Sequence, residues 1–180
     1  SDQELAHIAQ MVKQSVEEGA VGFSTSRFLL HTVPDGRCTP GTWADLRETK
    51  AIQEAVIAGG GIGAVFQSAN DMQTRYQTEL QMFRDGTELG CQVLFSGGTG
   101  AEGDGGVARW SEFLEQQNEG GKRIASVCHT RPSGSFFGLA QLSPFTRNSM
   151  AWRDLMALPT IEDRVNALRN DATRAKLIAE

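Results

Sequence analysis

Two kinds of hydrophobic spacing alternate along the first 130 residues of the chain. Apolar residues three or four positions apart predict an amphipathic helix, and the first such series is Leu5, Ile8, Val12 and Val16. Short apolar runs instead predict buried strands, and four of them lie at residues 20–26, 62–67, 92–96 and 124–128. Because helical spacing returns between these runs, we expect strands that alternate with helices. That alternation indicates right-handed crossovers, a parallel sheet and the α/β fold class.

Polar residues at characteristic spacings mark the expected helix starts. Ser1–Glu4 and Thr42–Asp45 both fit a capping box, in which side chains satisfy free backbone groups at the start of a helix. Asp71 is a candidate cap for the helix that follows the second strand. Gly19 should end the first helix, because glycine tolerates the left-handed conformation found at many helix ends.

The pattern changes after residue 130. A long irregular stretch leads to short helices expected near Trp152, behind a cap at Thr160, and over residues 172–180. We expect a single domain over residues 1–180, with β/α units at 1–130 and a loop and helical part at 131–180.

Composition narrows the possible partners. The 180 residues are 39% hydrophobic and 22% charged, with a formal net charge of −5 and no basic run. An acidic chain of this kind has no electrostatic basis for binding nucleic acid or an anionic membrane. The polar start does not resemble a signal peptide, and no apolar run approaches the roughly 20 residues that span a bilayer. Three separated cysteines without a CxxC motif favour free thiols in a reduced, cytoplasmic setting.

Candidate binding residues follow the predicted strands, because parallel sheets bind ligands at the C-terminal ends of their strands. Arginine suits a carboxylate ligand through bidentate hydrogen bonds, although a salt bridge to Asp35 or another acid is an equal alternative. Ser24, Thr25 and Ser26 could act as nucleophiles only beside a base, so polar capping of the strand end is the favoured interpretation. The candidate substrate-binding residues are Ser24, Arg27, His31, Asp35, Arg37, Gln67, Asn70, Ser96, His129 and Arg131.

A glycine-rich segment offers a nucleotide-binding alternative. Gly98–Gly103 matches G-x-G-x-x-G after a predicted strand and before a predicted helix. Glu102 and Asp104 would place negative charge beside a pyrophosphate, so a plain loop is the favoured interpretation.

Histidines could hold zinc at the same sheet edge. His31 and His129 both follow strands and could combine with Asp35 or Cys38. Their spacing carries no local zinc-binding signature, and loop histidines more often serve as hydrogen-bonding residues. We therefore expect no metal site formed by this chain.

Two groups of motifs resemble the N-acyl-D-amino-acid deacylase family of the amidohydrolase superfamily. The first group contains Gly22–Arg27, His31, Asp35–Arg37 and Pro40–Thr42. The second group, in the same order as in the family, contains Arg131–Gly134, Gly138–Leu139, Pro144–Phe145 and Trp152–Leu155. The resemblance spans nearly the whole chain but only the middle portion of a full-length family member.

The resemblance implies a (β/α)₈ barrel that hydrolyses the amide of N-acyl-D-amino acids. In the family, a zinc ion activates water and an aspartate late in the barrel moves the proton. Two zinc-binding histidines are expected after successive strands, where this chain has Gln67–Asn70 and Ser96–Gly98. Glutamine and serine are poor zinc ligands, so we expect the isolated chain to be inactive.

A partial barrel must cover its open sides. Four strands leave two unpaired sheet edges and an exposed apolar interior. The helical part from Trp152 onward could pack there, or two copies could meet as an isologous dimer, and we expect a homodimer. Three functions therefore stand as hypotheses: a fragment of an amidohydrolase, a free-standing oligomeric module that binds a small carboxylate, and, less favoured, a nucleotide-binding α/β domain.

Overall fold

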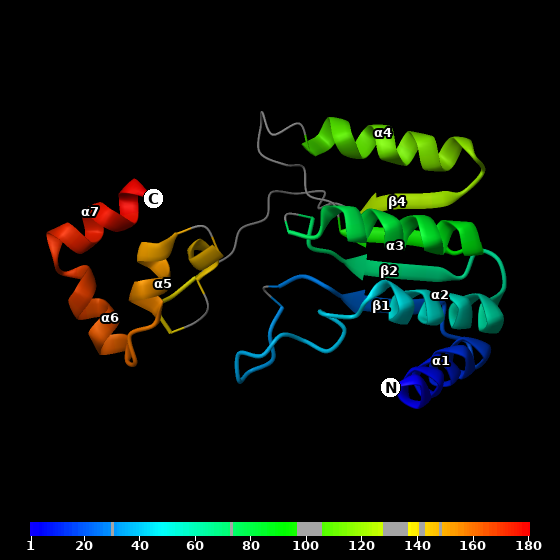
Figure 1. Cartoon of the computed structure of the whole chain (residues 1–180), viewed down its shortest axis with the longest axis horizontal. Helices are drawn as coiled ribbons and strands as arrows, with labels where there is room; N and C mark the ends of the chain where they lie inside the picture. Colours follow the sequence, from blue (N-terminus) through cyan, green and yellow to red (C-terminus); the bar gives the residue numbers. More distant parts are fainter. Residues whose placement is uncertain (30, 73, 97–105, 128–136, 141–142, 148) are drawn as a thin grey trace. The chain divides into compact units, whose positions relative to one another are not determined.

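The computed structural model describes residues 1–180 except 30, 73, 97–105, 128–136, 141–142 and 148. The chain divides into two compact units, Ser1–Arg131 and Pro132–Glu180. This division falls where the sequence pattern was expected to change. Figure 1 shows the elements of each unit.

The first unit is a parallel α/β structure. Its sheet has the strand order β1-β2-β3-β4, and every neighbouring pair is parallel. The predicted α/β class and the parallel sheet are therefore confirmed. The strands are β1 (Gly22–Ser26), β2 (Val65–Ala69), β3 (Gln92–Ser96) and β4 (Arg123–Val127), and the helices are α1 (Asp2–Glu17), α2 (Leu46–Gly60), α3 (Tyr76–Leu89) and α4 (Gly106–Glu119).

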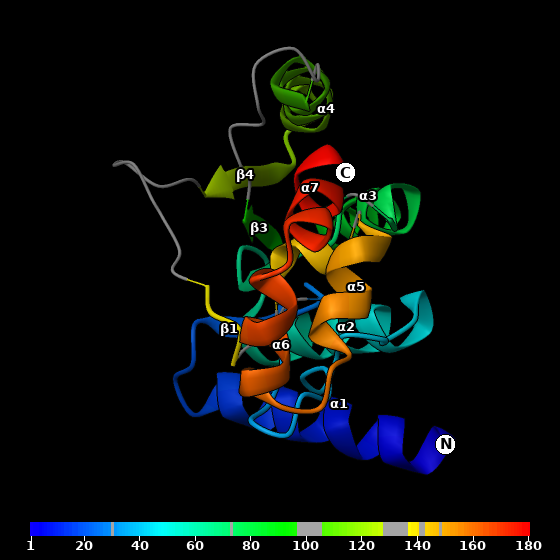
Figure 2. The same ribbon diagram turned by 90° about the vertical axis from the view of Figure 1, so that its left-hand side faces the viewer.

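Helices cover one face of this sheet. Sequential strand order with right-handed crossovers places the connecting helices on the same side, and Figure 2 shows α2, α3 and α4 there. Phe66, Val93, Phe95 and Ile124 point to this side and form the core with helix residues such as Phe83. We call the opposite side the helix-free face, because no helix described in the first unit covers it. Its central row, aligned by the register, is Ser24, Gln67, Leu94 and Ala125.

Two predicted helix starts were wrong. Helix α2 is capped by Asp45, whose carboxylate accepts a 2.8 Å hydrogen bond from the Glu48 amide. Thr42 instead donates its hydroxyl to the Thr39 carbonyl at 2.8 Å, within the turns that precede the helix. Helix α3 begins at Tyr76 rather than behind Asp71, because the Asp71 carboxylate binds the Thr74 hydroxyl and closes a separate turn.

The second unit is helical. Thr160 caps α6 as predicted, since its hydroxyl accepts a 3.1 Å hydrogen bond from the Asp163 amide. The hydrophobic core of this second unit is small and is formed by Ala151, Leu155 and Leu177 with partly buried neighbours. The elements are a 3₁₀ turn, η1 (Pro144–Arg147), followed by α5 (Met150–Met156), α6 (Ile161–Leu168) and α7 (Asp171–Ala179). No described helix in either unit has the length and hydrophobicity needed to cross a bilayer.

Candidate functional site

A polar pair lies on the helix-free face. The β1–β2 register places Ser24 opposite Gln67, and the Ser24 hydroxyl donates to Gln67 Oε1. This bond fixes the orientation of the Gln67 side chain, so its amide nitrogen remains as a hydrogen-bond donor on the same face. The structure thus brings together two of the predicted binding residues.

A second pair lies at the C-terminal end of β1. Ser26 Oγ and His31 Nδ1 are 2.5 Å apart, and Ser26 projects to the same face as Ser24 because alternate strand residues share a face. The Phe28 ring meets the imidazole edge-on, with ring centroids 5.2 Å apart. The Thr39 amide also donates to the His31 carbonyl at 3.1 Å. An imidazole held beside a hydroxyl can accept its proton, so this pair can perform acid–base chemistry.

Asp35 and Arg37 bind each other. The Pro34–Gly36 turn forms as its sequence suggests, with Gly36 at φ +88°. Arg37 Nε and a terminal guanidinium nitrogen both contact Asp35 Oδ2, at 2.9 and 2.7 Å. The Arg37 side chain lowers the pKa of Asp35 from its usual value. Both side chains are exposed, and the Arg37 guanidinium, which lines a surface hollow together with Cys38 and Trp43, is already bound to Asp35.

Arg27 is buried in an ion pair on the opposite, helix-covered side. Its Nε lies 2.8 and 3.1 Å from the two carboxylate oxygens of Glu79 in α3, and the side chains are 1% and 0% exposed. A terminal nitrogen of Arg27 also donates to the Ala44 carbonyl at 2.5 Å. Burial raises the pKa of Glu79, while the positive charge of Arg27 opposes that shift. Of the two alternatives for Arg27, carboxylate binding or a salt bridge, the structure shows a salt bridge.

Arg75 joins this buried pair to the neighbouring loop. Its two terminal nitrogens donate to the carbonyls of Thr42, at 2.6 Å, and of Arg27, at 2.5 Å. Its guanidinium also lies 5.3 Å from the centre of the exposed Trp43 ring. Arg75 and Glu79 therefore hold the loop that carries His31, and no local sequence pattern indicates either role.

The remaining candidates are placed differently. Ser96 is exposed at the end of β3, on the helix-free face. Asn70 directly follows β2 and is only 8% exposed. His129 and Arg131 lie outside the described residues, as does the glycine-rich segment 98–103.

The described side chains do not fit a catalytic zinc ion. The strand ends carry Gln67 and Ser96, whose uncharged oxygens are weak zinc ligands. Cys38 lies in the loop bridge with Thr32, and no three His, Cys, Asp or Glu residues of the described chain gather as a metal site.

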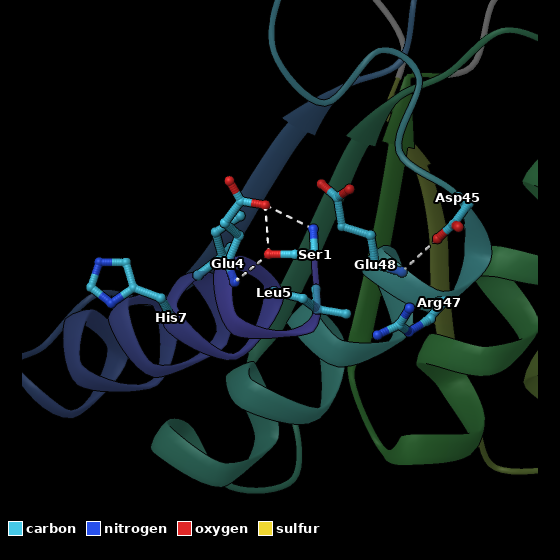
Figure 3. A pocket seen from close by; sticks show the side chains of 8 residues that line it. Ser1, Glu4, Leu5, His7, Asp45, Arg47 and Glu48 are labelled. Carbon is cyan, nitrogen blue, oxygen red and sulfur yellow. Dashed lines mark hydrogen bonds and ion pairs between the residues drawn. The ribbon is translucent and has the colours of Figure 1, made fainter.

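A groove lies between the N-terminal ends of α1 and α2 (Figure 3). Several of its polar groups are already bonded: Glu4 binds Ser1, Asp45 binds the Glu48 amide, and Arg47 binds Asp2. His7 points away from the Asp45–Glu48 pair in Figure 3. The groove is therefore a weaker candidate than the strand ends. Its lining is Ser1, Glu4, Leu5, His7, Ile8, Asp45, Arg47 and Glu48.

The fold and the strand-end geometry define an α/β protein with a polar site on one face of a parallel sheet. No protein-family model, curated protein or solved structure matches the chain.

Proposed function

We propose that the chain forms half of a (β/α)₈ barrel of the amidohydrolase lineage and binds a small N-acyl amino acid. The observation that carries this proposal is the pair of polar contacts, Ser24–Gln67 and Ser26–His31, on the helix-free face. In a closed barrel that face becomes the interior, and ligands bind at its C-terminal rim.

The strand order supports the barrel interpretation. Four parallel strands follow one another in sequence, with the connecting helices on a single face. A doubly wound sheet would reverse its strand order and place helices on both faces. The motif resemblance to N-acyl-D-amino-acid deacylases supplies the ligand class.

The polar contacts suit an acyl amino acid. The Gln67 amide nitrogen can donate to a carboxylate or an acyl carbonyl, and His31 offers an imidazole beside Ser26, at the end of β1. The ligand's own amide and carboxylate would meet these groups without a metal ion. We expect binding without metal-dependent turnover from this chain.

Isothermal titration calorimetry with N-acetyl-D-leucine tests the proposal. We expect binding to the whole chain, and about tenfold weaker binding for Gln67→Ala and His31→Ala, as for the loss of one hydrogen bond. Ser15→Ala is the matched control, because the Ser15 hydroxyl bonds only within α1, to the Met11 carbonyl. Equal affinity in the wild type and both site variants would contradict the proposal.

The Ser26–His31 contact favours a second function, acyl transfer without a metal. Ser26 Oγ would attack an activated acyl carbon while His31 takes the hydroxyl proton; the leaving group departs, and water later cleaves the ester. With p-nitrophenyl acetate, this function predicts a burst of p-nitrophenolate that Ser26→Ala and His31→Ala abolish. A burst of equal size in Ser26→Ala would exclude it.

We also propose that a second copy completes the barrel. In the described residues β1 pairs only with β2, and β4 only with β3, so both outer strands keep unpaired edges. A two-fold rotation would bring β4 of one copy beside β1 of the other in parallel and close a ring. Analytical ultracentrifugation should show a dimer, and Val127→Lys, on the inner face of β4, should weaken it. A folded monomer at micromolar concentration would contradict this proposal.

A further inference from the structure

A short hairpin carries His31 to the end of β1. The Thr39 amide donates to the His31 carbonyl at 3.1 Å, and Thr32 pairs with Cys38 in an antiparallel bridge. His31 and Thr39 therefore lie side by side at the base of this hairpin. The imidazole is attached to that base, so its position beside Ser26 depends on how the base is held.

Arg75 holds both ends of the chain segment that contains the hairpin. One terminal nitrogen of its guanidinium donates to the Arg27 carbonyl, at 2.5 Å, and the other donates to the Thr42 carbonyl, at 2.6 Å. Arg27 precedes the hairpin and Thr42 follows it, so a single side chain joins the two ends. A planar guanidinium has fixed donor directions, and it therefore fixes the separation of the two carbonyls.

Hydrogen bonds continue from Thr42 to the base of the hairpin. Thr42 is fully buried, and its hydroxyl and amide both donate to the Thr39 carbonyl, at 2.8 and 3.2 Å. Thr39 is the residue whose amide binds the His31 carbonyl. A continuous path of bonds thus joins the Arg75 guanidinium to the backbone of His31.

The same end of the segment lies directly against β1. Gly41 adopts φ +87°, and a Cβ atom at this position would lie only 2.8 Å from the Thr25 hydroxyl oxygen. A side chain there would collide with the strand, so glycine allows the close approach. Thr25 immediately precedes Ser26, and the contact therefore seats the segment next to the hydroxyl that the imidazole meets.

The guanidinium of Arg75 is itself oriented by two neighbours. Its Nε lies 4.0 Å from a carboxylate oxygen of Glu79, which is also bound to Arg27. The guanidinium lies 5.3 Å from the centre of the Trp43 ring. The Arg75 side chain is 19% exposed, so a small ion from solvent can reach the space that it occupies once the side chain is removed.

We propose that Arg75 is the positioning residue for the Ser26–His31 pair. It acts through the backbone, by fixing the base of the hairpin that carries the imidazole. This proposal rests on the function proposed above for the Ser26–His31 contact and identifies what aligns the two side chains. A merely structural role would stabilise the fold without altering how the hydroxyl and the imidazole meet.

The coupling between Ser26 and His31 tests the proposal. In nuclear magnetic resonance spectra, Ser26→Ala should move the ring signals of His31, because the two side chains are in contact. In an Arg75→Ala background, Ser26→Ala should cause no further movement of these signals, because the imidazole no longer meets Ser26. A full movement in that background would overturn the proposal.

An arginine of the second unit provides the matched control. Arg164 also donates to two carbonyls, those of Leu158 and Leu139. Arg164→Ala should therefore remove similar bonds and leave the Ser26–His31 coupling unchanged. Guanidinium ions, at a concentration too low to unfold the protein, should restore the coupling in Arg75→Ala. Loss of the coupling in both arginine variants would indicate a general loss of stability and would overturn the proposal.

Arg75→Lys serves if the alanine variant does not fold. It retains the positive charge beside Glu79, but one ammonium replaces two donors of fixed direction. The urea midpoint should stay close to that of the wild type, while the Ser26–His31 coupling falls. Full coupling in this folded variant would overturn the proposal.

The rate of acyl transfer separates this proposal from the function on which it rests. With p-nitrophenyl acetate, Arg75→Ala should slow the burst of p-nitrophenolate about a hundredfold, as expected when a reacting group is misplaced by roughly 1 Å. Arg164→Ala should give the wild-type burst. A wild type without a burst would exclude acyl transfer, while loss of the Ser26–His31 coupling in Arg75→Ala would still support the positioning role. A wild-type burst rate in Arg75→Ala would overturn that role.

Discussion

The two faces of the sheet in the first unit differ in chemistry although they share one backbone. On the helix-covered face, Phe66, Val93 and Phe95 are fully buried. On the helix-free face, the same strands present Ser24, Gln67 and Leu94 in one aligned row. Successive strand residues alternate between faces. The residues of a single strand can therefore stabilise the fold on one side and bind a ligand on the other. Substitutions on the two faces should therefore separate the two properties.

The largest expected effect is a loss of packing on the helix-covered face. Phe95→Ala should lower the free energy of unfolding by about 3–5 kcal/mol, because it leaves a cavity next to the stacked Phe83 ring. Leu94→Ala, one residue away but half-buried on the helix-free face, should lower the free energy of unfolding of the monomer by only about 1 kcal/mol. Urea unfolding of the two variants measures the difference. Equal losses would show that the helix-free face is packed as tightly as the core.

The buried ion pair should have the next largest effect. Glu79→Ala leaves the Arg27 guanidinium buried without its partner, and we expect a loss of about 3 kcal/mol. Asp35→Ala breaks an exposed arginine pair of the same type and should cause no measurable loss. Thermal unfolding of both variants provides the measurement. A loss of similar size in the two would contradict the distinction between a structural arginine and a solvent-exposed one.

A cap substitution gives a smaller effect. Asp45→Ala should reduce the free energy of unfolding by about 1 kcal/mol, since the Glu48 amide loses its acceptor at the start of α2. Asp45→Asn should retain most of the stability, because asparagine also caps helices. An unchanged urea midpoint for the alanine variant would show that α2 does not depend on this cap.

The smallest effect on stability is expected at the polar pair. Ser24→Ala should change the free energy of unfolding by less than about 0.5 kcal/mol, since Ser24 is exposed. Its effect should instead appear in ligand affinity, because Gln67 would lose the bond that orients it. Calorimetric titration beside urea unfolding measures both quantities. A large loss of stability would place Ser24 with the structural residues instead.

The sequence predicted the strands well because their signal is local. The run at 92–96 coincides with β3, and the other three strands lie within a few residues of the predicted runs. Helix starts were less predictable, since Thr42 and Asp71 have the chemistry of caps but are engaged in turns that precede the helices. A capping pattern alone does not show which backbone amide the side chain will meet.

The candidate site was predictable only in part, because the position of a residue after a strand does not show which distant residue its side chain will contact. Strand-end position predicted Ser24, Gln67 and His31, and the structure brings them to one face or its rim. The same rule also selected Arg27, whose partner Glu79 lies 52 residues further along the chain, in a helix with no motif. Ser26 was not among the predicted binding residues, although the two-residue period of the strand places it beside Ser24. Long-range partners of buried charges carry no local signal.

Mapping of N-acetyl-D-leucine by amide chemical shifts tests the central claim most directly. We expect shifts at Ser24, Ser26, His31 and the Gln67 side chain, and no shifts at the residues that line the α1–α2 groove. Shifts confined to that groove, or no shift at millimolar ligand, would contradict a binding site on the helix-free face.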